Sequence, residues 1–298
     1  MEHTKSDRRL VYVLNPAAGK GKYLPDARRA AEEARADIVH LTERQGECID
    51  FIANTCLTDP DTHFVVYGGD GTVAEAANGI IRAGAGNTAL LSIIPAGTGN
   101  DFVRSFPEKD KIYTVDALKY GDRYAANIIN FGFDSRVVAK TALYKKAFPG
   151  SAAYLAGVAD TFFRKIGERW QLELEDENGQ VETFDEEFTL ALAANCQYYG
   201  GGFRAAPLAD PSDGLLDFMA VTKVTRPQFL RLIGEYKKGT HLDPVTERPY
   251  PKFEKIVTYR RCKRIRISGI HDRCADGEIE PATEIEVSVV PGVLRIAT

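Results

Sequence analysis

The first third of the chain alternates short apolar runs with helix-like segments, and this alternation constrains the fold more than any other feature. Apolar runs of strand length lie at 10–14, 37–41, 64–67 and 89–95. Segments with helical spacing lie between them, at about 25–36, 46–57 and 72–83. Strand, helix and strand at this spacing predict a parallel sheet with helices on both faces.

Three polar, glycine-bearing loops follow these strands directly. They are "NPAAGKGK" (15–22), "GGDGT" (68–72) and "PAGTGNDF" (95–102). Ligands of parallel α/β sheets bind at the carboxyl ends of the strands, where all three loops fall. Glycines let the backbone approach a ligand closely, and a helix that starts behind them offers free N–H groups to an anion. One such loop is usually only a turn, but three at one edge indicate a ligand site.

The loops do not match two common nucleotide signatures. A Walker A loop would need glycine and Ser or Thr where the chain has Leu14 and Gly21, and the first strand is not followed by G-x-G-x-x-G. Two glycine-rich loops with an aspartate each, Asp70 and Asp101, instead suggest a polyphosphate bound with a divalent cation. A cap on the helix that follows would by itself explain the aspartate at position 101, without a cation.

Beyond residue 122 the rhythm changes. Helical stretches lie at about 135–147 and 152–167, and Asn178-Gly179 between two alternating runs predicts a hairpin. Further strands are expected at 188–195, 215–221, 254–259, 263–268 and 284–290. We therefore expect an α/β nucleotide-binding domain at 1–122 and a mainly antiparallel β domain at 123–298. The last strand is expected to pack back on the first domain, and the active site to lie in a cleft that the two share.

Composition excludes several classes of protein. A formal net charge of -4 gives no electrostatic footprint for nucleic acid. No apolar run approaches the roughly 20 residues that a membrane span needs, and the N-terminal apolar stretch is too short for a signal peptide. Five cysteines without a CxxC pair favour reduced thiols in the cytoplasm over disulfides or zinc.

The motifs, taken together, resemble the diacylglycerol kinase catalytic-domain family, which includes soluble bacterial lipid kinases and the sphingosine and ceramide kinases. The resemblance rests on the three loops in their order and spacing, and then on "NFGFDSRV", "GGGFRAAPLADPSDGLLDF" and "ADGE". It implies a Rossmann-like or phosphofructokinase-like first domain, a β-sandwich-like second domain, and ATP-dependent phosphorylation of a lipid hydroxyl. Diacylglycerol is the first choice of acceptor, with phosphatidylglycerol or a sphingoid base as alternatives.

The resemblance also assigns roles to individual residues. Asp70, Asp101 and Asp116 would form an aspartate–water–Mg²⁺ network, although Asp116 taken by itself reads as a solvated strand-edge residue. Glu278 of "ADGE" would be the general base. The nucleotide site would comprise Asn15, Pro16, Ala17, Ala18, Gly19, Thr42, Gly68, Gly69, Asp70, Gly71, Thr72, Val73, Ala74 and Thr98.

A second, structural Mg²⁺ is implied at the "ADPSDGLLDF" loop, through Asp210, Asp213 and Leu215. An ordinary β-turn explains the same residues and is compatible with an ion.

A lipid acceptor also implies peripheral contact with the inner face of the membrane. Residues 140–170 mix basic and aromatic side chains, which suits either a docking surface or packing within the domain, and packing is favoured for most of them. The cluster "RRCKRIR" (260–266) is expected to be a solvated face. The resemblance allows a homodimer.

Two other classes of function compete with a lipid kinase. An NAD kinase shares the GGDG loop, but the chain has no second glycine-rich Asn-Glu-Tyr loop for the other nucleotide of NAD. A regulatory protein that binds nucleotide without catalysis would be expected to have lost some of the acidic residues that the resemblance makes functional. Every one of these residues is present in the chain.

Overall fold

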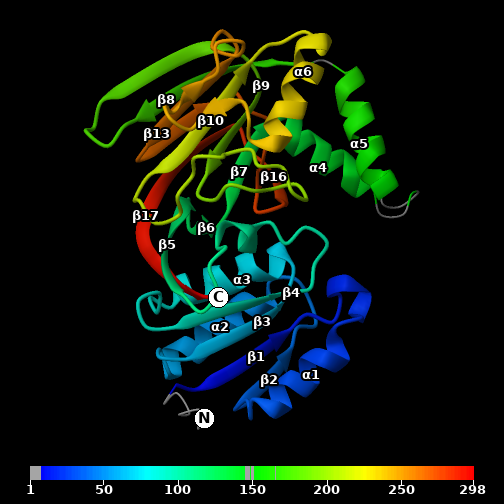
Figure 1. Ribbon diagram of the computed structural model, residues 1–298, viewed down its shortest axis with the longest axis vertical. Helices are drawn as coiled ribbons and strands as arrows, with labels where there is room; N and C mark the ends of the chain where they lie inside the picture. Colours follow the sequence, from blue (N-terminus) through cyan, green and yellow to red (C-terminus); the bar gives the residue numbers. More distant parts are fainter. Residues whose placement is uncertain (1–7, 145–147, 149–150, 165) are drawn as a thin grey trace. The chain divides into compact units, whose positions relative to one another are not determined.

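The computed structural model describes residues 8–144, 148, 151–164 and 166–298, which form two compact units (Figure 1). The first unit extends to Asp116 and also includes Pro291–Thr298, and the second is Ala117–Val290. Each unit is considered by itself.

The first unit is built on a parallel sheet, as the alternation predicts. Its strands are β1 (Leu10–Leu14), β2 (Ile38–Leu41), β3 (His63–Gly68) and β4 (Leu90–Pro95). Their order is β4–β3–β1–β2, with every neighbouring pair parallel. Two residues near the C-terminus, Ile296 and Ala297, add a further parallel pairing beside β4. The carboxyl ends of all four strands therefore lie at one edge of this sheet.

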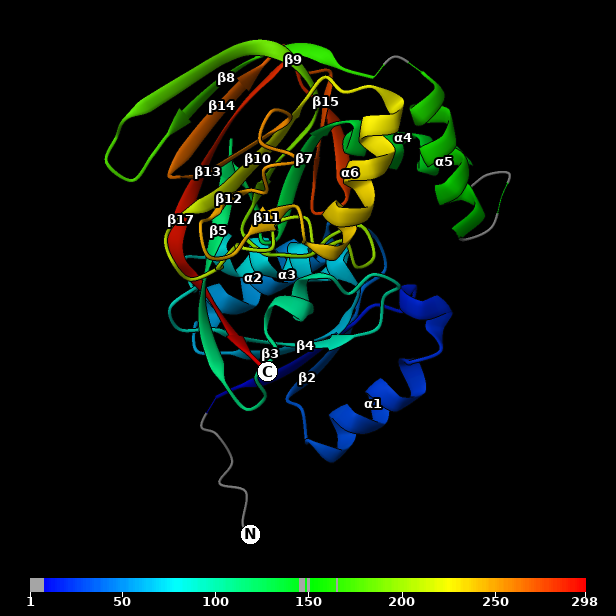
Figure 2. The ribbon, with the colours of Figure 1, turned by 45° about the horizontal axis from the view of Figure 1, so that its top comes forward.

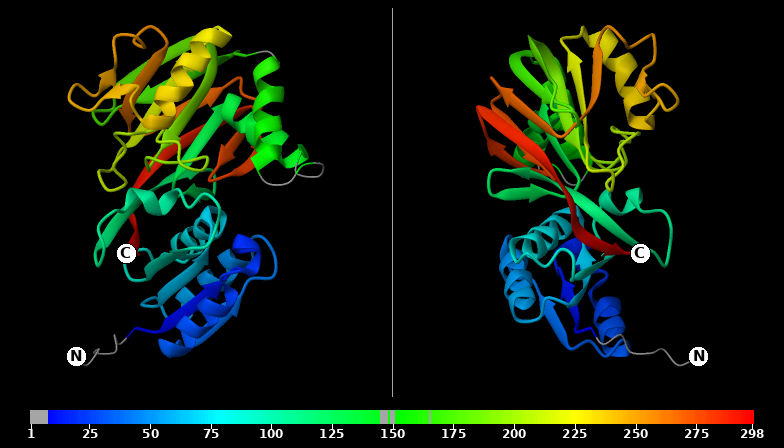
Figure 3. Two further views of the ribbon diagram at one scale, coloured as in Figure 1. Left: turned by 45° about the vertical axis from the view of Figure 1, so that its right-hand side comes forward. Right: turned by 90° about the vertical axis from the view of Figure 1, so that its left-hand side faces the viewer.

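Three helices cover the sheet, namely α1 (Leu24–Glu33), α2 (Glu47–Thr58) and α3 (Asp70–Arg82). Helix α1 buries Ala27 and Ala31 against Tyr12 and Leu14 on one face. Helices α2 and α3 pack against each other on the opposite face (Figure 3). This arrangement follows because the chain moves one way from β1 to β2 and the other way from β2 to β3 and from β3 to β4. Right-handed crossovers then place α1 on one face and both α2 and α3 on the other.

The second unit is mainly antiparallel β. Its larger strands are β7 (Ile128–Gly132), β8 (Glu168–Glu175), β9 (Val181–Ala194), β10 (Leu216–Thr222), β13 (Val257–Cys262), β14 (Arg264–Ser268) and the first part of β17 (Glu284–Ala297). Shorter strands are β6 (Arg123–Ala125), β11 (Leu242–Asp243), β12 (Arg248–Pro249), β15 (Asp272–Ala275) and β16 (Glu278–Pro281). Strand β5 (Ile112–Tyr120) begins in the first unit and ends in the second. The predicted hairpin at Asn178-Gly179 is confirmed, because it joins β8 to β9 with φ of +78° at Gly179.

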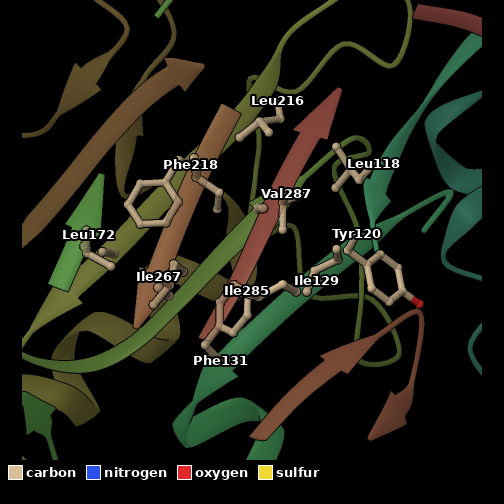
Figure 4. Packing of buried hydrophobic residues seen from close by; sticks show 14 of the residues in the cluster. Leu118, Tyr120, Ile129, Phe131, Leu172, Leu216, Phe218, Ile267, Ile285 and Val287 are labelled. Carbon is tan, nitrogen blue, oxygen red and sulfur yellow. The ribbon is translucent and has the colours of Figure 1, made fainter. Parts of the chain in front are cut away.

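The second half of β9, residues 188–194, is buried on both faces, which explains its nearly continuous apolar run. Ala191 and Ala193 face a core that also holds the residues labelled in Figure 4, from β5, β7, β8, β10, β14 and β17. Leu190 and Leu192 face a second core. Helices α4 (Phe133–Tyr144), α5 (Ser151–Phe163) and α6 (Arg226–Lys238) cover that second core (Figure 2). The unit is thus sandwich-like: further strands cover the first of these cores and helices cover the second.

The structure also departs from the sequence-based expectations. Helix α6 was not predicted, although Thr225 and Gln228 form a capping box at its start. Helix α5 ends at Phe163 rather than near 167, and the predicted end of the helix before it, at 145–147, lies outside the described residues. Within the described part of the chain, no helix is both long and apolar enough to cross a membrane.

Candidate active site

Asn15 ties together two of the glycine-bearing loops at the carboxyl edge of the first sheet. Its backbone N–H donates to the carbonyl of Tyr67 at 3.0 Å, and its side-chain Nδ2 donates to Thr72 Oγ1 at 2.8 Å. Its Oδ1 accepts the N–H of Ala17 at 2.9 Å. The end of β1 is therefore linked through side chains and backbone to the end of β3 and the start of α3.

Helix α3 begins at Asp70, two residues earlier than the spacing predicts, with Gly69 as an extended N-cap. The Asp70 carboxylate, in the first helical turn, accepts two backbone N–H groups from the loop after β4. Its Oδ1 lies 2.7 Å from the nitrogen of Asp101 and 3.1 Å from that of Phe102. Asp70 thus holds the third loop in place, which is a structural role that the sequence did not reveal.

The glycines around Asp70 have different physical reasons. A Cβ on Gly68 would lie 2.5 Å from Cβ of Thr72, and one on Gly97 would lie 2.5 Å from Cα of Gly69. Gly68 is therefore crowded by the first turn of the helix that follows it, and Gly97 by the neighbouring loop after β3. A Cβ on Gly71 would meet nothing within 4 Å. Only Gly71 therefore has the open surroundings at the helix N-terminus that suit an approaching anion.

Two carboxylates converge beside Gly99. A Cβ on this residue would lie 2.8 Å from Asp70 Oδ2 and 3.4 Å from Asp101 Oδ2. Asp101 is buried, and the expected cap is not formed, because Asp101 makes no side-chain cap hydrogen bond to the 3-10 turn Phe102–Ser105. Mg²⁺ commonly binds through one or two carboxylates together with phosphates and waters, and this pair fits that donor set. Among the described residues, no group of three or more acidic, His or Cys side chains forms a complete cage.

The other candidates of the first unit have distinct environments. Asp116 is 2% exposed and its Oδ1 accepts the N–H of Gly292 at 2.7 Å, so its interpretation as a solvated strand-edge residue was wrong. Thr42 donates its N–H to the carbonyl of Leu14, next to the first loop, and Thr98 is exposed. Val73 is 3% exposed, which places its side chain in the core.

Residues 17–21 complete the first loop. The backbone is left-handed at three consecutive residues, Gly19, Lys20 and Gly21, with φ of 54°, 59° and 74°. A Cβ on Gly19 would lie 2.6 Å from the ring of Tyr23. Glycine at position 19 is therefore required by both conformation and space. Lys20 itself is exposed beside this turn.

In the second unit, Glu278 opens strand β16 of the β15–β16 hairpin. The turn of this hairpin is Asp276-Gly277, and the Asp276 carboxylate accepts the N–H groups of Ala126, Asn127 and Ile128 at 2.7, 3.0 and 3.0 Å. The aspartate of the "DGE" motif therefore anchors the hairpin to the start of β7. This anchor fixes the position of the backbone that carries Glu278.

Sequence reasoning missed Arg123, the residue of β6 that contacts Glu278. Its Nη2 lies 2.5 Å from Glu278 Oε2, and the side chains are 36% and 32% exposed. Burial acts to lower the pKa of Arg123, but Tyr120 and the carboxylates of Glu278 and Glu280 outweigh burial and raise it. No sequence motif indicates this pairing, because 155 positions separate the two residues.

The loop expected to bind a structural ion forms a hydrogen-bonded turn. Asp210 Oδ1 accepts the N–H of Ser212 at 3.0 Å, and Asp213 Oδ1 accepts the N–H of Leu215 at 2.9 Å. The other Asp213 oxygen pairs with Arg261. The guanidinium places a positive charge beside the proposed ligand, so the ion here stays a prediction.

Two compositional expectations can be compared with the structure. In the basic cluster at 260–266, Arg260 pairs with Glu182, and Arg264 pairs with Glu175 and Glu286. These pairs suit the expected solvated face. All five cysteines are buried and free in the structure, and their reduced state stays a prediction.

Comparison with known proteins agrees with this architecture. The model of the "Diacylglycerol kinase catalytic domain" matches residues 9–130, and that of the "YegS C-terminal NAD kinase beta sandwich-like domain" matches residues 127–298. A diacylglycerol kinase of Mycobacterium tuberculosis is 26% identical over 97% of this chain and 94% of its own length. A probable YegS-like lipid kinase of Chromohalobacter salexigens is 29% identical, over 96% of this chain and 91% of its own length.

A solved structure gives the same fold. The crystal structure of a putative diacylglycerol kinase from Bacillus anthracis superposes with a TM-score of 0.70 at 21% identity, and it covers 97% of this chain and 96% of its own. Since the two family models together account for residues 9–298, the chain belongs to the diacylglycerol kinase and YegS-like lipid kinase family.

Proposed function

We propose that the protein transfers the γ-phosphoryl group of ATP to the hydroxyl of diacylglycerol and so forms phosphatidic acid. The observation that carries the proposal is the convergence of Asp70 and Asp101 beside Gly99, at the open N-terminus of α3. Charged phosphates and a divalent cation suit such a place. The choice of diacylglycerol comes from the names of relatives, among them the Mycobacterium tuberculosis protein.

In this proposal each unit supplies one part of the chemistry. The N–H groups at the start of α3 and the loop at residues 15–19 would bind the phosphates of ATP. Asp70 and Asp101 would hold a Mg²⁺ ion, which neutralises charge on the phosphates when it is bound. Glu278 would take the proton of the lipid hydroxyl while the hydroxyl oxygen forms a bond to the γ-phosphorus of ATP. The bond between the γ-phosphorus and the β–γ bridging oxygen would break at the same time, which releases ADP. General-base assistance of this kind typically contributes about 10²–10⁴-fold.

The test is transfer of label from γ-labelled ATP into lipid, with Mg²⁺ and mixed micelles of diacylglycerol. Phosphatidic acid should be labelled by the wild-type protein, and Glu278→Gln should lower kcat at least 100-fold. Glu284→Gln, an exposed glutamate of the same unit, is the matched control and should retain activity. Label in another lipid would change the acceptor, and label in NAD but in no lipid would refute the proposal.

We further propose that α4 and α5 contact the membrane that carries the acceptor. Part of the 140–170 segment is packed, as expected, since Trp170 is 1% exposed. Leu143, Leu155 and Phe163 are 60%, 64% and 75% exposed. Ala159 is also exposed, and residues 155, 159 and 163 follow one face of α5. Arg164, which pairs with Asp160 at 2.7 Å, is 65% exposed beside this face. Apolar side chains next to cations suit an anionic lipid surface.

Sedimentation with anionic phospholipid vesicles tests this contact. The double variant Leu155→Ser with Phe163→Ser should lower the partition coefficient at least tenfold, because each apolar side chain contributes about 1.5–3 kcal/mol when fully buried. Leu57→Ser removes an equally exposed leucine (70%) from α2 and should leave binding unchanged. Equal vesicle binding by the α5 variant and the wild type would show that this face of α5 does not contact the membrane.

A further inference from the structure

Three charged side chains and one tyrosine form a cluster with Glu278, namely Glu280, Arg273 and Arg123 together with Tyr120. Glu278 and Glu280 are two residues apart on β16, so they lie on the same face of the strand. Arg273 stands opposite Glu280 in the register of the β15–β16 hairpin, with its Nη2 2.7 Å from Glu280 Oε2. Arg123 of β6 contacts both glutamates, through Nη2 to Glu278 and Nη1 to Glu280.

The arginine that contacts Glu278 is itself held from several sides. Its guanidinium lies over the ring of Tyr120, 5.7 Å from the ring centre, and Arg273 lies over the same ring at 5.0 Å. Tyr120 is buried in the core shown in Figure 4, so the ring is a rigid base for both guanidiniums. Arg123 therefore has little freedom to move away from the carboxylate that it contacts.

We propose that Arg123 is the positioning residue of Glu278. It holds the carboxylate in one direction through a charge-assisted hydrogen bond from its Nη2 to Glu278 Oε2. The role rests on the proposed function, in which Glu278 accepts the proton of the lipid hydroxyl. Arg273 is not equivalent, although it shares the tyrosine ring, because the carboxylate that it contacts is that of Glu280.

The experiment is a double-mutant cycle in the phosphoryl-transfer assay. Arg123→Gln should lower kcat about 10–100-fold, which is the scale expected when a reacting group is misplaced by about 1 Å. The KM for ATP should stay within twofold, since the change is not made in the phosphate loops. Arg123→Lys keeps the charge and should recover part of kcat. Arg273→Gln is the matched control and should stay within threefold of the wild type.

The decisive measurement is the same substitution in the Glu278→Gln background. If Arg123 acts through Glu278, Arg123→Gln should then change the residual rate less than threefold, because residues that act as a unit are not additive. A full 10–100-fold loss in that background, or no loss from Arg123→Gln alone, would overturn the positioning role while leaving the kinase proposal intact. A wild-type protein that phosphorylates no lipid would overturn both.

Discussion

Asp70 holds the loop after β4 and is proposed to bind the cation, and these two roles can be separated by comparing Asp70→Asn with Asp70→Ala. Oδ1 accepts two backbone N–H groups, at 2.7 and 3.1 Å, and Oδ2 lies at the proposed cation position beside Gly99. Asparagine keeps an acceptor for the two N–H groups but loses the charge, whereas alanine loses both. Hydrogen bonds to a charged group contribute about 1.5–3 kcal/mol each, and neutral ones about 0.5–1.5 kcal/mol.

The expected losses in the free energy of unfolding follow from those values. Asp70→Ala should cost about 3–6 kcal/mol and Asp70→Asn about 2–3 kcal/mol, measured by urea denaturation. Both variants should lose at least 100-fold in phosphoryl transfer, because the charge at Oδ2 is absent in each. Asp50→Asn, an exposed surface carboxylate of α2, is the control and should change stability by less than about 0.5 kcal/mol. An active Asp70→Asn protein would refute the charge role, and an Asn variant as unstable as Ala would refute the hydrogen-bond reasoning.

Three further predictions address other parts of the molecule. Gly99→Ala places a Cβ 2.8 Å from the Asp70 carboxylate and should lower the phosphoryl-transfer rate about 100-fold. Burial raises the pKa of Asp134 from 3.8 to about 6, so the folded chain keeps a proton that the unfolded chain releases above about pH 4. The contribution of Asp134 to the free energy of unfolding should therefore fall by about 2.4 kcal/mol as the pH rises from 4 to 7, and urea melts of Asp134→Asn should lack this fall. Gly132→Ala combines φ of +75° with a Cβ 2.6 Å from the ring of Trp170, and urea denaturation should show a loss of about 3 kcal/mol or more.

The local pattern of the sequence was sufficient for the first unit. Strand and helix periods at 10–95 predicted four parallel strands and the edge where their loops meet, because burial on both faces imposes continuous apolar runs on parallel strands. The Asn178-Gly179 turn was equally readable, since its backbone conformation strongly favours those residues. Helix α6 could also have been found from its capping box at Thr225 and Gln228.

Contacts between distant residues decided what the sequence left open. Asp116 looks like a solvated residue in its own segment, yet it is buried and binds the backbone of Gly292, 176 positions away. Gly68 and Gly97 suggested a ligand. The structure shows that Gly97 must be small because the loop after β3 packs against it, whereas Gly68 is crowded by Thr72, four residues further along the chain.

The sequence by itself determined the order of strands and helices in the first unit, the glycine-bearing loops and the family, because these depend on residues close together in the chain. The tertiary structure decided which side chain accompanies each candidate. The pairing of Arg123 with Glu278, and the hydrogen bonds from the loop after β4 to Asp70, join residues 155, 31 and 32 positions apart. No local period or motif encodes such a pairing, since it exists only when packing brings separate elements together.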